Sequence, residues 1–263
     1  AVSAYAENAS WLRYPSISPD GKSVVFSYGG DLYIVASEGG EARKLTSHQA
    51  YDYSPVWSPD GKTIVFASDR FGNFDIYKVS VKGGVPQRLT TNSAKETPWT
   101  FTPDGKSILF TARIQDPASS VLFPKSSMTE LYSVSIEGGR PQQVLATPAE
   151  EISFVGNTGT FLYQDCKGGE NIWRKHHTSS ITRDIWMYDG ANHTKLTDFK
   201  GEDRTPRVSA DGKTVYFTSE RDGSFNVYSF PIDNPSQVKK ITRHKTHPVR
   251  FLTVSDNGVL CYA

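Results

Sequence analysis

The residues with the clearest capacity for chemistry form a basic and titratable cluster between positions 165 and 183. Arginine and lysine side chains bind carboxylates through charge-assisted hydrogen bonds, and histidine can add a titratable donor. The cluster therefore predicts a site that holds a carboxylate group. Its members are Arg174, Lys175, His176, His177 and Arg183.

The adjacent histidines do not predict a metal site. His176 and His177 are neighbours in an extended segment, so their side chains point to opposite sides, and no third ligand is suggested. No GxSxG motif occurs, and the Ser and Thr residues fall where polar strand faces and turns need them. We therefore assign no catalytic residue, no metal ligand and no cofactor to this chain.

A second long segment, between Arg113 and Thr129, carries an apolar run that includes Phe123. Phe123 is a candidate contact for a peptide or for a neighbouring domain. The alternative is that both segments simply pack on each other, or on domains outside this sequence.

The secondary structure that positions these residues can be predicted from a repeated sequence segment. One copy, which starts at Pro55, reads PVWSPDGKTIVFASDRFGNFDIYKV. Its Ser-Pro-Asp-Gly stretch is a tight turn, because Pro presets the first central residue and Gly accepts the positive φ that follows. A β-branched and aromatic strand, a second turn and an alternating strand come next. With a short fourth strand at 87–90, the unit is a four-stranded antiparallel meander.

The turn occurs six times, and successive copies lie roughly 40 to 54 residues apart. Four strands in a period of about 40–45 residues are typical of a β-propeller, whose blades stack because one sheet cannot hide both faces. We predict a single all-β domain over residues 1–263. It is a β-propeller of four-stranded antiparallel blades, six-bladed with the sixth blade truncated. The blades start near residues 14, 53, 97, 150, 205 and 248.

The sixth unit has only its first two strands, and an open hydrophobic edge invites aggregation. We therefore expect either a fragment of a longer chain or a ring whose last blade borrows a strand from residues 1–14. The links between second and third strands are longest in blades three and four, at 113–129 and 165–183. Because such links emerge on one face of a propeller, we expect the two to meet, where function concentrates on loops.

Several other residues are given structural roles. Arg70 and Arg221, each after an acidic residue, predict ion pairs within blades. Trp57 and Trp99 precede turns on inner strands, where they pack between blades or line a channel. The two cysteines, Cys166 and Cys261, are expected to be separate thiols, and a disulfide between them is left open.

Composition excludes some classes of protein. The chain has 29 basic and 28 acidic side chains, a net charge of +1, which argues against a nucleic-acid surface. No stretch approaches the roughly 18 apolar residues of a membrane span. Self-association is left open.

The repeated SPDGK…F.S.R.GN.DIY…GG…LT phrase resembles the propeller repeats of TolB-like proteins over nearly the whole chain. Residues 11–21 and 171–186 look like the N-terminal propeller of tricorn-type serine peptidases, especially the bacterial secreted branch. The resemblance implies a six-bladed propeller followed by a second propeller, a PDZ domain and a catalytic domain. It implies that the propellers filter and guide peptides toward a serine in a later domain.

Three functions follow. The leading one is a non-catalytic propeller that guides peptides in a tricorn-like serine peptidase, with peptides or downstream domains as partners. The second is a stand-alone TolB-like interaction propeller of the cell envelope. The third is a propeller-fold carbohydrate lyase, which six scattered histidines support little. The family branch and the missing initiator Met predict a periplasmic or extracellular location, with the cytoplasm as the alternative.

Overall fold

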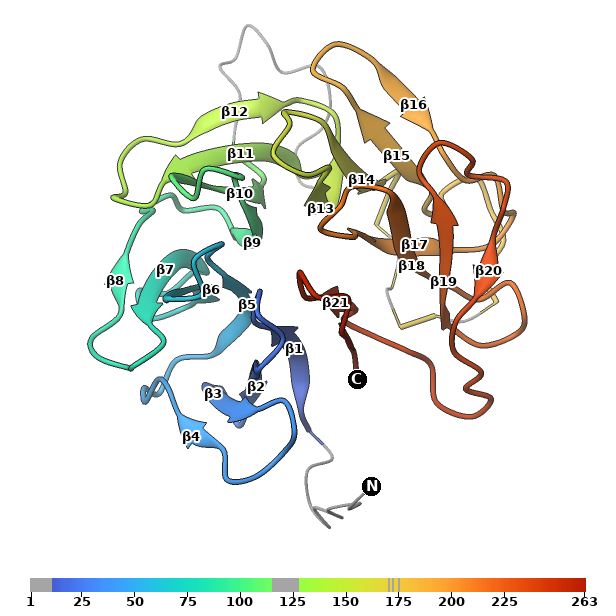
Figure 1. The fold of residues 1–263 in the computed structure, drawn as a ribbon. Coiled ribbons are helices and arrows are strands. Elements are labelled where there is room, and N and C mark those ends of the chain that lie inside the picture. Colours follow the sequence, from blue (N-terminus) through green and yellow to red (C-terminus); the bar gives the residue numbers. More distant parts are fainter. Residues whose placement is uncertain (1–10, 115–127, 170, 172, 175) are drawn as a thin grey trace, which may run out of the picture.

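A wheel of antiparallel sheets forms the whole molecule (Figure 1). The computed structural model describes residues 11–114, 128–169, 171, 173–174 and 176–263, and these residues contain strands but no helix. Five of the sheets have four strands, and a sixth has two. The predicted β-propeller of four-stranded antiparallel blades is thereby confirmed.

Each four-stranded blade is a meander, because its strands pair in chain order. Blade one contains β1 (Arg13–Ile17), β2 (Ser23–Tyr28), β3 (Asp31–Ala36) and β4 (Arg43–Lys44). Blade two contains β5 (Asp52–Trp57), β6 (Thr63–Ser68), β7 (Asp75–Ser80) and β8 (Gln87–Arg88). Blade three contains β9 (Thr97–Phe101), β10 (Ser107–Ala112), β11 (Glu130–Ser135) and β12 (Gln142–Leu145).

The remaining blades repeat this order. Blade four contains β13 (Ala149–Phe154), β14 (Phe161–Asp165), β15 (Ile185–Tyr188) and β16 (His193–Lys195). Blade five contains β17 (Asp203–Val208), β18 (Thr214–Ser219), β19 (Asn226–Pro231) and β20 (Lys239–Lys240). The two-stranded sheet contains β21 (Thr253–Val254) and β22 (Leu260–Cys261).

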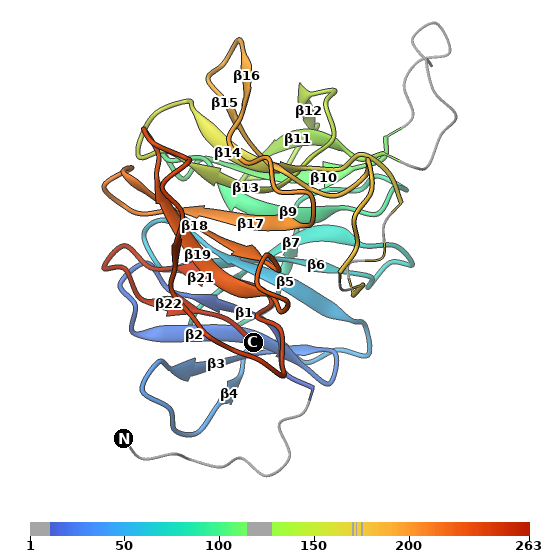
Figure 2. The same ribbon diagram turned by 90° about the vertical axis from the view of Figure 1, so that its right-hand side faces the viewer.

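The blade count differs from the predicted six, because only five sheets in the described residues have four strands. The two-stranded sheet lies between blade five and blade one, and both ribbon views place β21 beside β1 (Figures 1 and 2). Since β1 pairs with β2 in its own blade, residues 13–17 do not complete the last sheet.

The core lies between neighbouring blades rather than inside any one of them. Val25 and Leu32 of blade one pack on Ile64, Phe66 and Tyr77 of blade two, and all five are almost fully buried. Equivalent apolar clusters join blades two to three, three to four and four to five. This explains the repetition, because each blade supplies the cover for the next one.

A threonine after the fourth strand of blades one, two, four and five pairs with the backbone of the third strand. The Thr90 hydroxyl accepts a hydrogen bond from the backbone N–H of Ile76 at 2.9 Å, and Thr46, Thr197 and Thr242 serve blades one, four and five in the same way. Each threonine therefore satisfies a backbone donor that the short fourth strand leaves unpaired.

The predicted ion pairs within blades exist, but with other partners than the preceding acid. Arg70 Nη2 lies 2.8 Å from Asp52 Oδ2, on the inner strand, and Arg221 Nη2 lies 3.0 Å from Asp203 Oδ2. Asp69 instead accepts a hydrogen bond from the backbone N–H of Tyr51. Both inner-strand carboxylates are buried, and each arginine neutralises one of them. The sequence alone does not show which carboxylate pairs with which arginine.

The ring closes through polar contacts between the two-stranded sheet and blade one. The backbone N–H of Asp256 donates to the carbonyl of Pro19 at 2.8 Å, and the Asn257 amide donates to the carbonyl of Asp20 at 3.3 Å. Gly21 has a φ of +73°, and a Cβ atom there would lie 2.6 Å from Asn257 Oδ1.

Replacing Gly21 with Ala should therefore destabilise the fold and loosen this junction. A side chain in the left-handed region costs about 1–2 kcal/mol, and displacement of Asn257 adds to that cost. Gly61→Ala is the matched control, because Gly61 has the same turn conformation (φ +67°) and its nearest neighbour lies at 3.9 Å. Urea denaturation of both variants checks the prediction, and equal losses would contradict the role of the junction.

Candidate functional site

The axis of the wheel contains a cavity of about 700 Å³, which the inner strands of all six sheets line. The volume lies in the range of small-ligand sites. The ends of both long insertions also reach it, through Arg113 and Thr129 of blade three and Gly168 and Arg183 of blade four. The two insertions therefore border the same cavity at these ends.

A repeated β-bulge shapes the inner strands. In four blades the pairing of first and second strands shifts at the same place, and the bulge contains a non-glycine residue with φ between +53° and +55°. Phe251, with φ of +56°, has the corresponding place in the sixth unit. Each of these residues lies four positions before the turn that follows: Tyr14, Ser54, Glu151, Thr205 and Phe251. Such strained backbone is rare for non-glycine residues and clusters at functional sites.

Aromatic rings form one side of the cavity. The rings of Tyr14 and Tyr53 have centroids 5.4 Å apart, and those of Tyr14 and Phe251 are 4.5 Å apart. Burial raises the pKa of both tyrosines, so their phenols stay neutral at neutral pH. Trp99 lines the cavity and also packs against the apolar cluster between blades three and four, and its indole N–H donates to Thr111 Oγ1 at 3.0 Å.

Charged and amide side chains form the opposite side. Arg207 makes an ion pair with Glu151, and the Gln164 amide donates to Glu150 Oε2 at 3.2 Å. All four line the cavity, and they come from β13, β14 and β17. The sequence pattern does not single them out, although an alignment of the bulge positions of the repeats identifies Glu151.

Arg183 is the most unusual residue of this charged side. It is 4% exposed, and neither Nε nor Nη1 has a hydrogen-bond partner within the described residues. The nearest carboxylate oxygen in an ion pair with it is Glu150 Oε2, 3.9 Å from Nε. A buried guanidinium with two unpaired nitrogen atoms is costly, and an anion that reached it from the cavity would supply hydrogen bonds.

The repeat explains how Arg183 reaches this place. It directly precedes the Asp-Ile-Trp of the third strand, where blades two and five have Phe74 and Phe225 before their own third strands. Its carbonyl accepts the N–H of Asp203, as the carbonyl of Phe74 accepts that of Glu96. An arginine thus replaces an aromatic residue at a fixed position near the axis.

The other predicted site residues do not line this cavity. Arg174 is exposed, the His176 backbone N–H donates to Glu220 Oε2 at 2.6 Å, and His177 Nε2 lies 2.7 Å from Ser179 Oγ. Lys175 and Phe123 lie outside the described residues. Among the predicted peptide-binding residues that the structure describes, Arg183 alone lines the cavity.

Trp173, in the insertion of blade four, contacts residues of blade one and of the sixth unit. The Trp173 ring lies 5.2 Å from the Arg13 guanidinium and 5.0 Å from that of Arg250, and its centroid is 6.2 Å from that of Phe251. These contacts connect blade four with blade one and with the two-stranded sheet. They are favourable cation–π and edge-to-face geometries.

The cysteines have no place in nucleophilic chemistry at this site. Both are free, and Cys166 lines the cavity. Burial raises the pKa of the Cys166 thiol to about 11, so it stays protonated at neutral pH. In the described part of the chain, no group of three or more His, Cys, Asp or Glu side chains could hold a metal ion.

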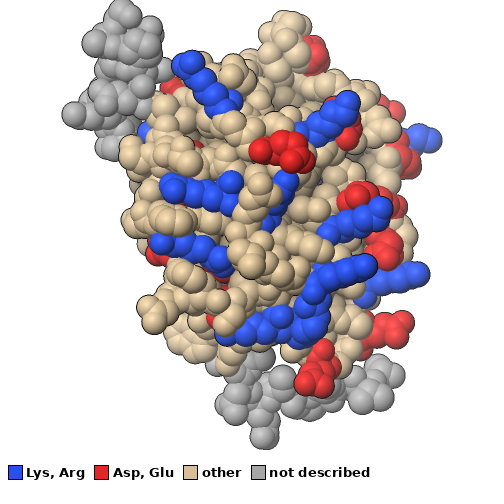
Figure 3. Space-filling model, turned by 90° about the vertical axis from the view of Figure 1, so that its left-hand side faces the viewer, with Lys and Arg blue, Asp and Glu red and all other residues tan. Residues whose placement is uncertain are grey.

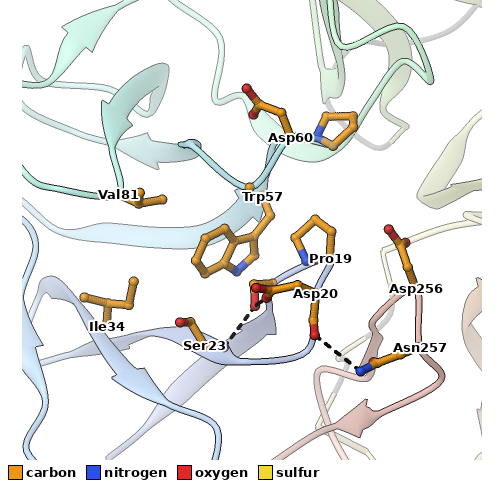
Figure 4. A pocket seen from close by; sticks show the side chains of 12 residues that line it. Pro19, Asp20, Ser23, Ile34, Trp57, Asp60, Val81, Asp256 and Asn257 are labelled. Atoms are coloured by element: carbon orange, nitrogen blue, oxygen red, sulfur yellow. Dashed lines mark hydrogen bonds between the residues drawn. The ribbon is translucent and has the colours of Figure 1, made fainter.

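A second hollow of about 600 Å³ lies on the face that carries the Ser-Pro-Asp-Gly turns (Figure 4). Trp57 stands in its middle, with its indole N–H bonded to the carbonyl of Ser16 at 2.8 Å. The carboxylates of Asp20 and Asp60 each accept hydrogen bonds from their own turns. Because these groups already serve the turns, the axial cavity is the better candidate site.

Surface charge shows no single basic patch on the side seen in Figure 3, where Lys and Arg side chains are spread out and Asp and Glu lie between several of them. No helix in the described residues is long and apolar enough to cross a membrane.

Comparison with solved structures reveals the same architecture in a known protease. The crystal structure of the tricorn protease superposes with a TM-score of 0.79 over 96% of this chain and 24% of that chain, at 23% identity. At that identity the likeness establishes the fold alone.

Local sequence matches connect the chain to two kinds of protein. It is 48% identical over 56 residues to the uncharacterized peptidase YuxL of Bacillus subtilis, and 49% identical over 43 residues to a TolB homolog of Chlorobium luteolum. These matches span 8% and 10% of the relatives' own lengths.

A family model covers almost the entire sequence. Residues 9–262 match the tricorn protease N-terminal β-propeller domain, which includes every described strand and the whole axial cavity. The chain therefore belongs to the family of tricorn protease N-terminal β-propeller domains.

Proposed function

We propose that this propeller binds extended peptides in its axial cavity and guides them, without cleaving them, as part of a tricorn-like serine peptidase. The observation that carries the proposal is Arg183, a buried residue that lines the cavity and has two guanidinium nitrogen atoms without hydrogen-bond partners among the described residues. A peptide carboxylate would supply charge-assisted hydrogen bonds to it. Cleavage would belong to other domains, and the partners would be peptides and those domains.

The proposal predicts a preference for peptides with a free C-terminal carboxylate. Arg183→Gln should weaken the binding of a free-acid peptide about 10- to 100-fold, because hydrogen bonds to charged groups contribute about 1.5–3 kcal/mol. Fluorescence anisotropy with one labelled peptide, as acid and as amide, measures this.

Arg140→Gln is the control, because Arg140 is exposed between β11 and β12 and does not line the cavity. It should keep the affinity and the preference for the acid. Equal affinity of the original chain for acid and amide would sink the proposal.

We also propose that the complete ring has six blades. The strands β21 and β22 would be the first two strands of the sixth blade. Phe26 and Tyr33 of blade one stack with centroids 5.9 Å apart, like Phe66 and Tyr77 of blade two, but only the latter pair is fully buried. A third strand paired with β22 would help to cover the blade-one pair. In this chain the amide of Leu260, which points away from β21 because its neighbour Val259 pairs with Ser255, should exchange hydrogen faster than the paired amides of β6. Equal protection would contradict an open edge.

A second candidate is a TolB-like interaction propeller of the cell envelope. It is supported by the 43-residue match to a TolB homolog and by three exposed aromatic residues, Trp11, Tyr28 and Tyr51, around a hollow of about 350 Å³. Under this alternative the peptide would bind in neither form. For both candidates we propose a location outside the cytoplasm, which cell fractionation would test.

A further inference from the structure

The axial cavity has two walls of opposite chemistry. An apolar wall comes from the two-stranded sheet and blades one to three, and an ionic wall comes from blades four and five. The apolar wall includes Phe251, Tyr14, Tyr53, Pro55, Val56 and Trp99. The ionic wall includes Glu150, Glu151, Gln164, Arg183 and Arg207.

The apolar wall is continuous around its part of the ring. Phe251 contacts Tyr14, Tyr14 contacts Tyr53, and Tyr53 contacts Phe74 with centroids 4.9 Å apart. Three successive inner strands thus present touching rings, and two of these rings stand on left-handed bulge residues. The bulge turns both side chains toward the axis, where they border the cavity.

The ionic wall is held in place by its own contacts. Glu151 pairs with Arg207, and Glu150 accepts from Gln164, whose Oε1 in turn accepts the backbone N–H of Thr205 at 3.0 Å. Two further basic residues, Lys95 and Arg113, line the cavity near blade three, where the walls meet. Lys95 Nζ lies 5.3 Å from the Tyr53 ring centroid, so it borders the aromatic side as a cation–π partner.

We infer that the cavity selects peptides by the alternation of their side chains, favouring aromatic or large apolar residues at every second position. Successive side chains of an extended peptide point to opposite sides. A chain along the axis would therefore place one set against the rings and the other set against the ionic wall. This inference rests on the proposed peptide-binding function and adds the class of peptide.

Two pentapeptide acids of equal composition test it, Ser-Phe-Ser-Phe-Ser and Ser-Ser-Phe-Phe-Ser. Only the first can direct both phenylalanines to one wall. We expect it to bind about two- to twelvefold more tightly, since an aromatic pair contributes about 0.5–1.5 kcal/mol beyond burial of its area. Isothermal titration of the intact 263-residue chain measures both affinities.

Tyr14→Asn and Phe251→Asn remove the rings without adding backbone strain, because asparagine tolerates the left-handed conformation of both positions. Each should bring the affinity ratio of the two peptides close to one and leave the preference for acid over amide. Thr205→Asn is the matched control, because Thr205 has a φ of +54° in the same bulge but does not line the cavity. It should keep the ratio.

The outcomes separate this inference from the proposed function. Equal affinity of the two peptides for the original chain, with the acid still preferred to the amide, overturns the two-wall selection alone. Arg183→Gln should weaken both peptides and keep their ratio, whereas loss of the ratio in that variant would contradict independent walls. Failure of both peptides to bind overturns the proposed function as well.

Discussion

Replacing Arg70 with Met is expected to lower the free energy of unfolding by about 3–5 kcal/mol, because the buried carboxylate of Asp52 would lose its counter-ion. Asp52 is fully buried, and Arg70 Nη2 lies 2.8 Å from it while Arg70 Nε donates to Ser68 Oγ at 3.0 Å. The guanidinium also lies over the rings of Phe66 and Tyr77, so the substitution removes favourable contacts as well. Urea denaturation followed by circular dichroism measures the loss.

The double variant Asp52→Asn with Arg70→Met should recover a large part of the loss, because it leaves no isolated charge inside the blade. Lys62→Met is a matched control: its ion pair with Asp60 spans 3.8 Å between two exposed side chains, so it should change stability by less than about 1 kcal/mol. If Arg70→Met changed the free energy of unfolding as little as that control, the ion pair between Arg70 and Asp52 would not contribute to stability as predicted.

Glu96→Gln is expected to stabilise the protein above neutral pH and to remove part of its pH dependence. In blade three, Glu96 occupies the position that Asp52 has in blade two. The position of Arg70 is occupied by Ile114, so no arginine stands there in blade three. Burial raises the pKa of Glu96 to about 7, with a smaller rise from the charge of Asp75, against the hydrogen bond from Thr90 and the positive charge of Arg88.

Since the folded-state pKa of Glu96 lies above its usual value of 4.5, the native state holds a proton that the unfolded state releases. This stability is fully present below pH 4.5 and is lost as the pH rises through about 7. The shift corresponds to about 3 kcal/mol. Glutamine is neutral throughout, so the variant should match the original chain near pH 4.5 and exceed it by up to about that amount at pH 8. Parallel pH profiles of urea midpoints would refute this prediction.

The candidate site was only partly predictable. Arg183 belonged to a predicted basic cluster, yet its neighbours Arg174, His176 and His177 lie outside the cavity that it lines. Arg183 lines the cavity because its position in the repeat places it just before the third strand of blade four. Arg174, His176 and His177 lie near it in sequence but belong to the insertion. The residues of the two walls, such as Tyr14 and Glu151, were missed because each is unremarkable within its own blade.

The sequence by itself determined the blade. Turn residues, alternating strands and the threonine after the fourth strand recur at a fixed period. Each of these signals depends on residues that are close together in sequence, so the secondary structure of a blade can be predicted from its own residues. The tertiary structure alone decided what meets at the axis: which carboxylate pairs with Arg70, that Arg183 is buried beside a cavity, and that rings and charges line opposite walls. These contacts join residues from different strands and blades, and only closure of the wheel and the bulge in each inner strand bring them together.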